Sequence, residues 1–471
     1  MTPGRVNPFI RVESLARAPD PVAAFRRLAA HGDAFLLDSA LPGGEHGRYS
    51  FVGGFPGRTI MTRGRDVRVC EDGRVRRHRG DPWKALRKAF GAFHASSGNF
   101  PFPFAGGAVG FFSYDLAWCF EQLPHRAKDD LDGPDAFWGF YDAILVADHR
   151  TGKMHVVARE IPGGYGGQRL REVVNEASAR TPAGRPVTVT GRKSPARMVS
   201  NFTRPAYLAA VQRVKDHIAA GDVYQVNISQ RFSAPAQDPV TLYERLRRVS
   251  PAPYAGILKC GDVWVLSSSP ELFVSVRGRN VVTRPIKGTR PRGRTPAEDR
   301  RLRRELVSSA KDRAELAMIV DLERNDLGRV CRFGSVRVTE DRVIESYRNV
   351  HHGVATVRGE LAEGGDVLDL VRAAFPSGSV TGAPKIRSME IIDSLEPVRR
   401  GVYTGSVGWI GANGDADLNV AIRTMVWKDG RVHFHVGGGI VADSDPIAEY
   451  EETLTKGRGM MEALGIRNDF A

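Results

Sequence analysis

Apolar residues recur at two different spacings along the chain. From residue 1 to about residue 160 they form short runs broken by Gly and Pro, for example at 34–38 and 143–146, and only a segment around 82–94 favours a helix. The glycine-rich stretch 104–112 precedes no helical pattern, so it indicates close strand packing and not a phosphate-binding loop. The N-terminal part is therefore predicted to be mostly β.

The composition changes between residues 161 and 204, where Gly, Pro, Arg, Thr and Ser dominate. A segment of this kind is typical of a connector. It predicts a division into an N-terminal part (1–160), a connector (161–204) and a C-terminal part (205–471).

The C-terminal part alternates blocks of strands with blocks of helices. Four runs at hairpin spacing predict an antiparallel sheet that leads into Lys287: 254–259, 263–268, 272–276 and 281–286. Helical spacing covers 207–220, a long region at 297–327, and the segments 367–374, 384–395 and 446–464. Such blocks favour an α+β fold over a βαβ repeat.

Composition argues against several classes of protein. No window of the 471 residues approaches the ~18 uninterrupted apolar residues of a membrane span, and the N-terminus has no apolar signal region. The net charge of +14 is dispersed and lacks a nucleic-acid-binding motif, so solvated faces or an anionic small substrate explain it better. The four cysteines form no C-x-x-C pair. We expect a soluble cytoplasmic protein with reduced thiols that binds neither nucleic acid nor membrane.

Lys287 stands at the end of a β-branched run and directly before a glycine, Gly288. This arrangement places the lysine at a strand end, where the backbone can turn or approach a ligand. Burial and the nearby cations Arg284, Arg290 and Arg292 would favour the neutral amine, which is a nucleophile. The alternative is an ordinary lysine in a basic turn.

Two pairs of acids have the i, i+3 spacing that places both members on one helix face. They are Asp312 with Glu315, and Glu449 with Glu452. Acids from two helices suit Mg²⁺, which needs oxygen ligands and keeps several waters. Solvated helix faces carry the same pattern, so each pair alone leaves both interpretations open.

Three further features could take part in ligand binding or catalysis. A small-residue loop at 377–385 enters a helix and offers backbone N–H groups to an anion. Three glycines at 437–439 end a strand, where close approach of a ligand or of another backbone requires them. Glu271 is an isolated carboxylate in an apolar strand group, a setting that raises a pKa and suits a general acid. A helix cap, a tight bend and an edge-strand charge are the competing explanations.

Together these motifs resemble the chorismate-utilising enzymes. The resemblance covers nearly the whole chain and is carried by five stretches in one order: 222–228, 285–289, 311–315, 321–329 and 437–444. It implies an α+β fold of two packed large antiparallel β-sheets with helices outside, in which the N-terminal and C-terminal parts form one unit.

Within that family, two positions imply the chemistry. Relatives that add water carry a lysine where this chain has Gln225, so the resemblance implies ammonia as the attacking group. Relatives that form anthranilate usually carry alanine where this chain has Lys287. The resemblance thus implies amination at C4 of chorismate to 4-amino-4-deoxychorismate, in 4-aminobenzoate and folate synthesis. Anthranilate formation for tryptophan synthesis is the alternative.

Site roles follow from the same resemblance. It implies that Glu315 and Glu452 ligate Mg²⁺, that Asp312 and Glu449 complete its shell, and that Glu271 protonates the departing hydroxyl. The residues implied to contact chorismate, or to lie at or near family active-site positions, are Gly288, Thr289, His352, Thr381, Lys385, Tyr403, Arg423, Gly437, Gly438, Gly439 and Lys456.

Two expectations concern regulation and assembly. Residues 36–39, with Ser39 at their end, Tyr49 with Ser50, and Pro253 with Tyr254 resemble the family's tryptophan pocket, although strand packing explains these residues equally well. None of the four cysteines lies in the G-x-C-x-G setting of a glutamine amidotransferase. We therefore expect a glutamine amidotransferase subunit as the partner that supplies ammonia.

Overall fold

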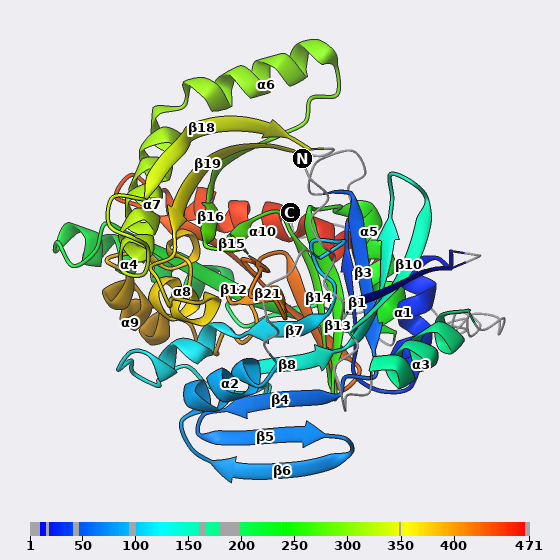
Figure 1. Ribbon diagram of the computed structural model, residues 1–471. Helices are drawn as coiled ribbons and strands as arrows, with labels where there is room; N and C mark the ends of the chain where they lie inside the picture. The colour runs from blue at the N-terminus through cyan, green and yellow to red at the C-terminus, as the bar shows by residue number, and fades with distance from the viewer. Residues whose placement is uncertain are drawn as a thin grey trace.

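Two antiparallel sheets form the centre of the molecule, and helices lie on their outer faces (Figure 1). The computed structural model describes residues 10–15, 18–40, 47–93, 100–159, 166–178, 198–236, 238–347 and 350–466. This architecture confirms the predicted α+β fold with two packed sheets.

The first sheet joins strands from both halves of the chain. Its order is β1 (Ile10–Ser14), β10 (Lys153–Arg159), β9 (Ala143–Asp148), β3 (Tyr49–Gly54), β2 (Ala34–Asp38), β13 (Tyr254–Cys260), β14 (Val263–Ser269), β23 (Thr424–Lys428), β24 (Arg431–Ile440), β12 (Gln225–Pro235) and β11 (Val199–Ser200), with β20 (Gly382–Ala383) beside β12.

The second sheet is also built from both halves. Its order is β17 (Ile286–Pro291), β19 (Val350–Glu360), β16 (Asn280–Arg284), β15 (Leu272–Arg277), β22 (Ala416–Asn419), β21 (Ser406–Gly411), β7 (Gly107–Phe112), β8 (Ala136–Tyr141), β4 (Arg58–Arg63), β5 (Asp66–Glu71) and β6 (Arg74–Arg79), with β18 (Arg337–Ser346) beside β19.

The helices begin where their caps predict. Asp20, Asp81, Asp238 and Asp445 each cap a helix that has Pro in its first turn, where a missing N–H costs nothing. The α-helices are α1 (Pro21–Ala30), α2 (Pro82–Gly91), α3 (Gly166–Ser178), α4 (Arg204–Ala219), α5 (Pro239–Val249), α6 (Pro296–Ser308), α7 (Ala310–Gly328), α8 (Val367–Ala374), α9 (Lys385–Leu395) and α10 (Pro446–Ala463), and two 3₁₀ turns are η2 (Tyr114–Cys119) and η3 (Gly378–Val380).

The core has a layer between the sheets and layers beneath the helices. Phe35 of β2 and Val265 of β14 pack with Phe111 of β7 and Trp409 of β21, so the two sheets share one apolar interior. Helices α5 and α10 cover the first sheet, and α7 and α8 cover the second. Because both halves of the chain supply each sheet, the fold holds distant residues rigidly together.

Two expectations about local structure need correction. The runs 254–286 do not form one sheet, because β13 and β14 belong to the first sheet while β15 and β16 belong to the second. The chain crosses between the sheets at Pro270, which cannot donate to a ladder. The region 297–327 is two helices, α6 and α7, separated at Ser309, whose side chain caps α7.

The expectation for the glycine-rich stretch 104–112 is confirmed. The glycines of 104–112 serve strand packing, because a Cβ at Gly110 would lie 1.9 Å from the Phe137 carbonyl oxygen on β8. Within the segment expected to be a connector, α3 packs against α1 and β10, while residues 179–197 lie outside the described residues.

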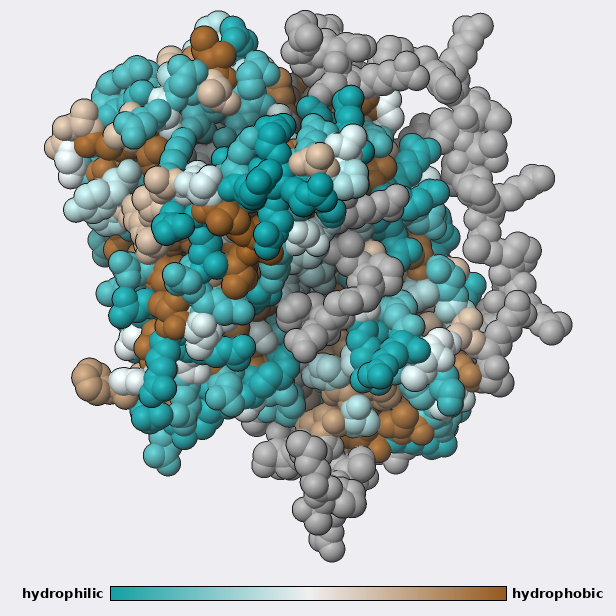
Figure 2. Space-filling view, turned by 90° about the horizontal axis from the view of Figure 1, so that it is seen from above, coloured by the Kyte–Doolittle hydropathy of each residue, from teal (hydrophilic) through white to brown (hydrophobic). Residues whose placement is uncertain are grey.

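The outer surface is polar on the face seen in Figure 2, where hydrophilic residues predominate and hydrophobic patches are small and separate. Among the described residues, no helix combines the length and the apolar character that a membrane crossing requires.

Candidate active site

Lys287 lies in a bulge of β17. The pairing of β17 with β19 shifts register between Ile286 and Thr289, which leaves Lys287 and Gly288 without regular partners. Gly288 has a φ of +80°, and a Cβ there would lie 2.9 Å from atoms of Asp312. Glycine is thus required both by the backbone conformation and by the close approach of α7.

The amine of Lys287 points into the protein. Its Nζ donates a hydrogen bond of 3.1 Å to the carbonyl oxygen of Ser379. Burial lowers the pKa of Lys287 and nearby Lys456 lowers it further, while Glu315 is the strongest of the acids that oppose the shift. The neutral amine is therefore easier to reach than in an exposed lysine.

The cause of this shift differs in part from the one expected. The three arginines close to Lys287 in sequence each pair with a carboxylate instead of facing the amine: Arg284 with Glu345, Arg290 with Asp312 and Arg292 with Asp299. Burial had been expected, but the cation that acts on Lys287 comes from α10, far away in sequence.

Glu271 occupies the crossing between the two sheets. It is 3% exposed, and burial raises the pKa of its carboxyl group. The N–H of Ile286 donates to its Oε1 over 3.3 Å, and the Ser379 hydroxyl is a second hydrogen-bond partner. A raised pKa keeps the proton on the carboxyl group to a higher pH, as a general acid requires.

Acids from α7 and α10 gather near Lys287. Burial raises the pKa of Glu315, and Glu452 is among the charges that contribute to it. Lys456 lies 2.7 Å from Glu452 and lowers the pKa of that glutamate. Glu449 accepts a hydrogen bond from Ser444, and burial raises its pKa. Glu315 and Glu449 are therefore largely enclosed, while the Glu452 side chain is 51% exposed, so the group of acids opens to solvent at Glu452.

Glycine is required at positions 437, 438 and 439 for different reasons. Gly437 and Gly439 are required by the protein itself, since a Cβ would lie 2.4 Å from the Ile228 carbonyl oxygen and 1.9 Å from Gln225 Nε2, respectively. A Cβ at Gly438 would instead lie 3.0 Å from Glu449 Oε2, near Glu452 and Lys456. Gly438 thus keeps space open in front of the acids.

Two buried polar atoms of this region have no hydrogen-bond partner among the described residues. They are Oε1 of Gln225 and Nε2 of His352. His352 Nδ1 pairs with the Thr289 hydroxyl at 2.9 Å, and burial followed by Arg423 lowers the pKa of its imidazole to about 3. A polar ligand would satisfy the unpartnered atoms.

Arg423 and Tyr403 have different surroundings. Burial alone lowers the pKa of the Arg423 guanidinium, with no carboxylate of the described residues opposing the shift, so an anionic ligand would be stabilising. Tyr403 is buried and stacks on His435 with ring centroids 5.0 Å apart. Arg400 links Tyr403 to the loop at η3, because it lies over that ring and donates to the Val380 carbonyl oxygen.

The loop 377–385 contributes in an unexpected way. Thr381 donates its hydroxyl to the Ser377 carbonyl oxygen, and Lys385 binds Asp326 at 2.6 Å, so both maintain the loop and the start of α9. Ser379, which the sequence analysis did not single out, contacts both Lys287 and Glu271. Only the three-dimensional contact distinguishes it from the other small residues of the loop.

Comparison with known proteins identifies the family. A model of the chorismate binding enzymes matches residues 47–462. The chain belongs to this family. It is similar to aminodeoxychorismate synthase component 1 of Bacillus subtilis, with 40% identity over 92% of each chain. It is also similar to anthranilate synthase component 1 of Streptomyces coelicolor, with 43% identity over 96% of this chain and 88% of the relative.

A solved structure supports the same assignment. Anthranilate synthase component I from Streptococcus pneumoniae matches with a TM-score of 0.78 and 33% identity, covering 89% of this chain and 92% of that one. The protein is thus a chorismate-utilising enzyme of the α+β fold found in this family. The two relatives are named as synthases of different products, aminodeoxychorismate and anthranilate, so the family alone does not decide the product.

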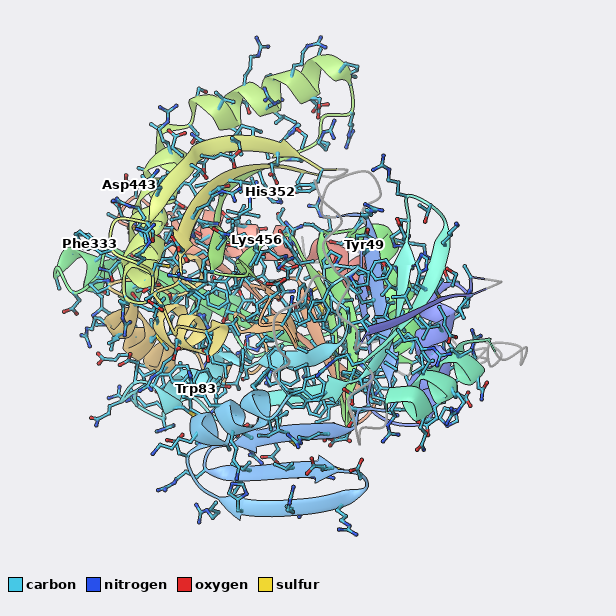
Figure 3. All side chains as sticks on the ribbon, in the orientation of Figure 1. Tyr49, Trp83, Phe333, His352, Asp443 and Lys456 are labelled. Atoms are coloured by element: carbon cyan, nitrogen blue, oxygen red, sulfur yellow. The ribbon has the colours of Figure 1, made fainter. Side chains whose placement is uncertain are left out.

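As a chorismate binding enzyme, the protein needs a site for a dicarboxylate. In Figure 3, Lys456 and His352 are labelled in the region between β19 and α10. Lys456 also donates to the Gly437 carbonyl oxygen at 2.9 Å, which fixes the ammonium beside the glycines. Cations at Lys456 and Arg423, with the space at Gly438, suit such a ligand.

The acid cluster fits a hard divalent cation when the ligand shares in binding. No three His, Cys, Asp or Glu side chains among the described residues converge closely enough to hold a metal alone. Mg²⁺ commonly takes one or two carboxylates, waters and an anion of the substrate. The mutual repulsion of Glu315 and Glu452, and the space in front of Glu449, match that requirement.

The residues expected at a tryptophan pocket surround a separate cavity of about 160 Å³. Ser39, Pro253 and Tyr254 line it, and Ser50 supports it by accepting a hydrogen bond of 3.0 Å from the Ser39 backbone. Tyr49, which also lines it, is labelled in Figure 3 away from His352 and Lys456. The predicted residues are therefore together in space, and tryptophan binding stays a prediction.

Proposed function

We propose that the protein aminates chorismate at C4 with ammonia, giving 4-amino-4-deoxychorismate for 4-aminobenzoate and folate synthesis. The observation that carries the proposal is the inward amine of Lys287, placed between Ser379 and the acids of α7 and α10. A lysine with a lowered pKa in this position is available as a nucleophile.

The steps balance as two successive displacements. Lys287 Nζ forms a bond to C2, the two ring double bonds shift, and the C4–O bond breaks as Glu271 gives its proton to the departing hydroxyl, which leaves as water. Ammonia then bonds to C4, the double bonds shift back, and the C2–Nζ bond breaks. The lysine is thus regenerated, and the buried site limits attack by water.

The other residues bind and orient the ring. Glu315 and Glu452 would hold Mg²⁺, with Asp312 and Glu449 nearby, and the metal supplies an electrostatic anchor for the ring carboxylate. Arg423 and Lys456 offer cations to the substrate's carboxylates, while Gln225 presents an amide where a water-activating lysine would otherwise stand.

The ammonia would come from a glutamine amidotransferase subunit. None of the four cysteines lies in the nucleophile setting of such an enzyme, which supports a separate chain for that step. We propose a heterodimer in which the partner hydrolyses glutamine.

Anthranilate formation is the second candidate, because the Streptomyces coelicolor relative with that name is 43% identical. Incubation of the protein with chorismate, ammonium and Mg²⁺, without any lyase, separates the two. We expect a product with the mass of aminodeoxychorismate that becomes 4-aminobenzoate only after a lyase is added. Fluorescent anthranilate without lyase would contradict the proposal.

A further inference from the structure

A buried hydrogen-bond chain joins Glu271 to a second carboxyl group, Glu323 on α7. Ser377 Oγ lies 3.0 Å from Glu323 Oε1 and 3.0 Å from Ser379 Oγ. The Ser379 hydroxyl in turn bonds to Glu271. All four side chains are buried. Two carboxyl groups are therefore connected by two hydroxyls, and each of the four side chains is at most 5% exposed.

The number of protons in this chain is constrained. Three links connect the four groups, each link needs one proton, and the two serine hydroxyls supply one each. The third proton has to come from one of the carboxyls. Either Glu323 donates to Ser377, or Glu271 donates to Ser379. With both carboxyls ionised one link is lost, so the chain is complete when the pair holds one proton.

We propose that Glu271 and Glu323 share one proton through the hydroxyls of Ser377 and Ser379, and that Glu323 supplies this proton to Glu271 in each turnover. The inference rests on the proposed function, in which Glu271 protonates the leaving hydroxyl. With the shared proton on Glu323, Glu323 gives it to Ser377 Oγ, the Ser377 proton moves to Ser379 Oγ, and the Ser379 proton moves to Glu271. Glu271 then passes a proton to the departing hydroxyl, which leaves both carboxyl groups ionised. Glu323 then takes a proton from solvent before the next turnover.

The charges around Glu323 are consistent with a proton reservoir. Burial raises the pKa of Glu323, Asp326 and Glu271 add to the shift, and Lys385 opposes it. The ammonium of Lys385 is bound to Asp326 at 2.6 Å and to the Ala374 carbonyl oxygen at 2.7 Å. The charge of Arg329 also opposes the rise that burial causes in the pKa of Asp326. The lysine is therefore compensated by another acid, which leaves Glu323 able to hold a proton.

The remaining contact of Glu323 does not compete with the chain. Thr283 Oγ1 on β16 lies 3.3 Å from its other oxygen, Oε2. Glu323 thus uses Oε1 for the path toward Glu271 and Oε2 for anchoring on the second sheet. A purely structural role would need only the anchoring and would leave the acid chemistry of Glu271 unchanged.

Glu323→Gln is the first test. The side-chain amide can donate to Ser377 or accept from it but cannot release a proton, so no proton can pass from residue 323 to Glu271. We expect kcat for C4 amination to fall by about 100-fold or more, with KM for chorismate unchanged. The alkaline limb of the kcat profile should move to lower pH, because the negative charge at residue 323, which opposes ionisation of Glu271, is removed.

Variants of Ser379 test the same hydrogen-bond chain if Glu323→Gln fails to fold. Ser379→Ala should lower kcat in the same way, and Ser379→Thr, which keeps a hydroxyl, should retain most of it. Asp321→Asn, on the exposed side of α7, is the matched control and should behave as wild type. Folding of each is checked by thermal unfolding.

The outcomes separate the two proposals. Wild-type kcat and an unmoved pH limb in folded Glu323→Gln or Ser379→Ala would overturn the shared proton while wild-type amination upholds the function. A wild-type enzyme that does not aminate chorismate would overturn the proposed function and the relay together.

Discussion

The Nζ of Lys287 and the carbonyl oxygen of Ser379 are 3.1 Å apart, and the Ser379 hydroxyl bonds to Glu271. One residue of a short 3₁₀ turn thus contacts both the candidate nucleophile and the candidate acid. Because the lysine comes from the second sheet and the glutamate from the crossing between sheets, this turn aligns groups that no local segment could align. Loss of the alignment should therefore affect both chemical roles.

Glu271→Gln should reduce kcat for amination by about 10²–10⁴-fold, the range typical of a lost general acid. KM for chorismate should change little, because the glutamine keeps the shape and the hydrogen bond from Ile286. Steady-state kinetics with ammonium as co-substrate measures both values. A variant with wild-type kcat would remove Glu271 from the chemistry.

His352 should make stability depend on acidity. Its folded pKa is about 3, below the usual value of 6.5, so the unfolded chain binds a proton first as the pH falls and stability is lost. At about pH 5 this amounts to about 2 kcal/mol. When the pH is lowered from about 8 to about 5, the free energy of unfolding should fall in both proteins. The fall should be about 2 kcal/mol smaller in His352→Gln than in wild type.

Urea unfolding at both pH values measures this difference, and the value at the higher pH corrects for the lost contact with Thr289. Equal losses in wild type and variant would show that His352 is protonated in the folded enzyme at the lower pH.

The acid cluster should make activity depend on Mg²⁺. Removal of divalent ions with EDTA should abolish amination, and added Mg²⁺ should restore it. Gly438→Ala should raise the Mg²⁺ concentration needed for half-maximal activity, because its methyl group would lie 3.0 Å from Glu449 Oε2. Gly91→Ala, where a methyl group meets nothing within 4 Å, is the control. Full activity in EDTA would contradict the metal site.

Arg400 should be a stability determinant of the loop that carries Ser379. It binds Glu396 at 2.7 Å and donates to the Val380 and Asn227 carbonyl oxygens, and both members of the ion pair are buried. Arg400→Met should cost about 3–5 kcal/mol of unfolding free energy, because Glu396 stays buried without its partner.

Chemical denaturation measures this cost. The double variant Arg400→Met with Glu396→Leu should lose less than the single variant, since no charge is then left buried. A single variant as stable as wild type would show that the ion pair does not hold the loop.

Much of the fold could be predicted from periodicity. Strands such as β14 and helices such as α10 pack against the core, and this burial requires apolar residues at regular spacing. Periodicity could not predict the sheet to which each strand belongs. β14 and β15 are consecutive and separated only by Pro270 and Glu271, yet they belong to different sheets. That choice depends on contacts with β23 and β22, which lie about 150 residues further along the chain.

The candidate site shows the same division. Lys287 and Glu271 could be found because a charged residue beside a β-branched run or inside an apolar strand group is unusual. The acids of α7 and α10 became candidates through their i, i+3 pairing together with the family resemblance. Ser379 and Glu323 could not be found, since a serine in a small-residue loop and a glutamate on a helix are ordinary. Their importance arises only when the fold brings them to Glu271.

The most direct test of the central claim is the product of Lys287→Ala with chorismate, ammonium and Mg²⁺, analysed by mass spectrometry and fluorescence beside wild type and Lys84→Ala, a control at an exposed lysine. We predict that C4 amination falls by on the order of 10³-fold or more in Lys287→Ala, with anthranilate as the only amination product that remains. Aminodeoxychorismate formed by Lys287→Ala at the wild-type rate would contradict the covalent role of the lysine.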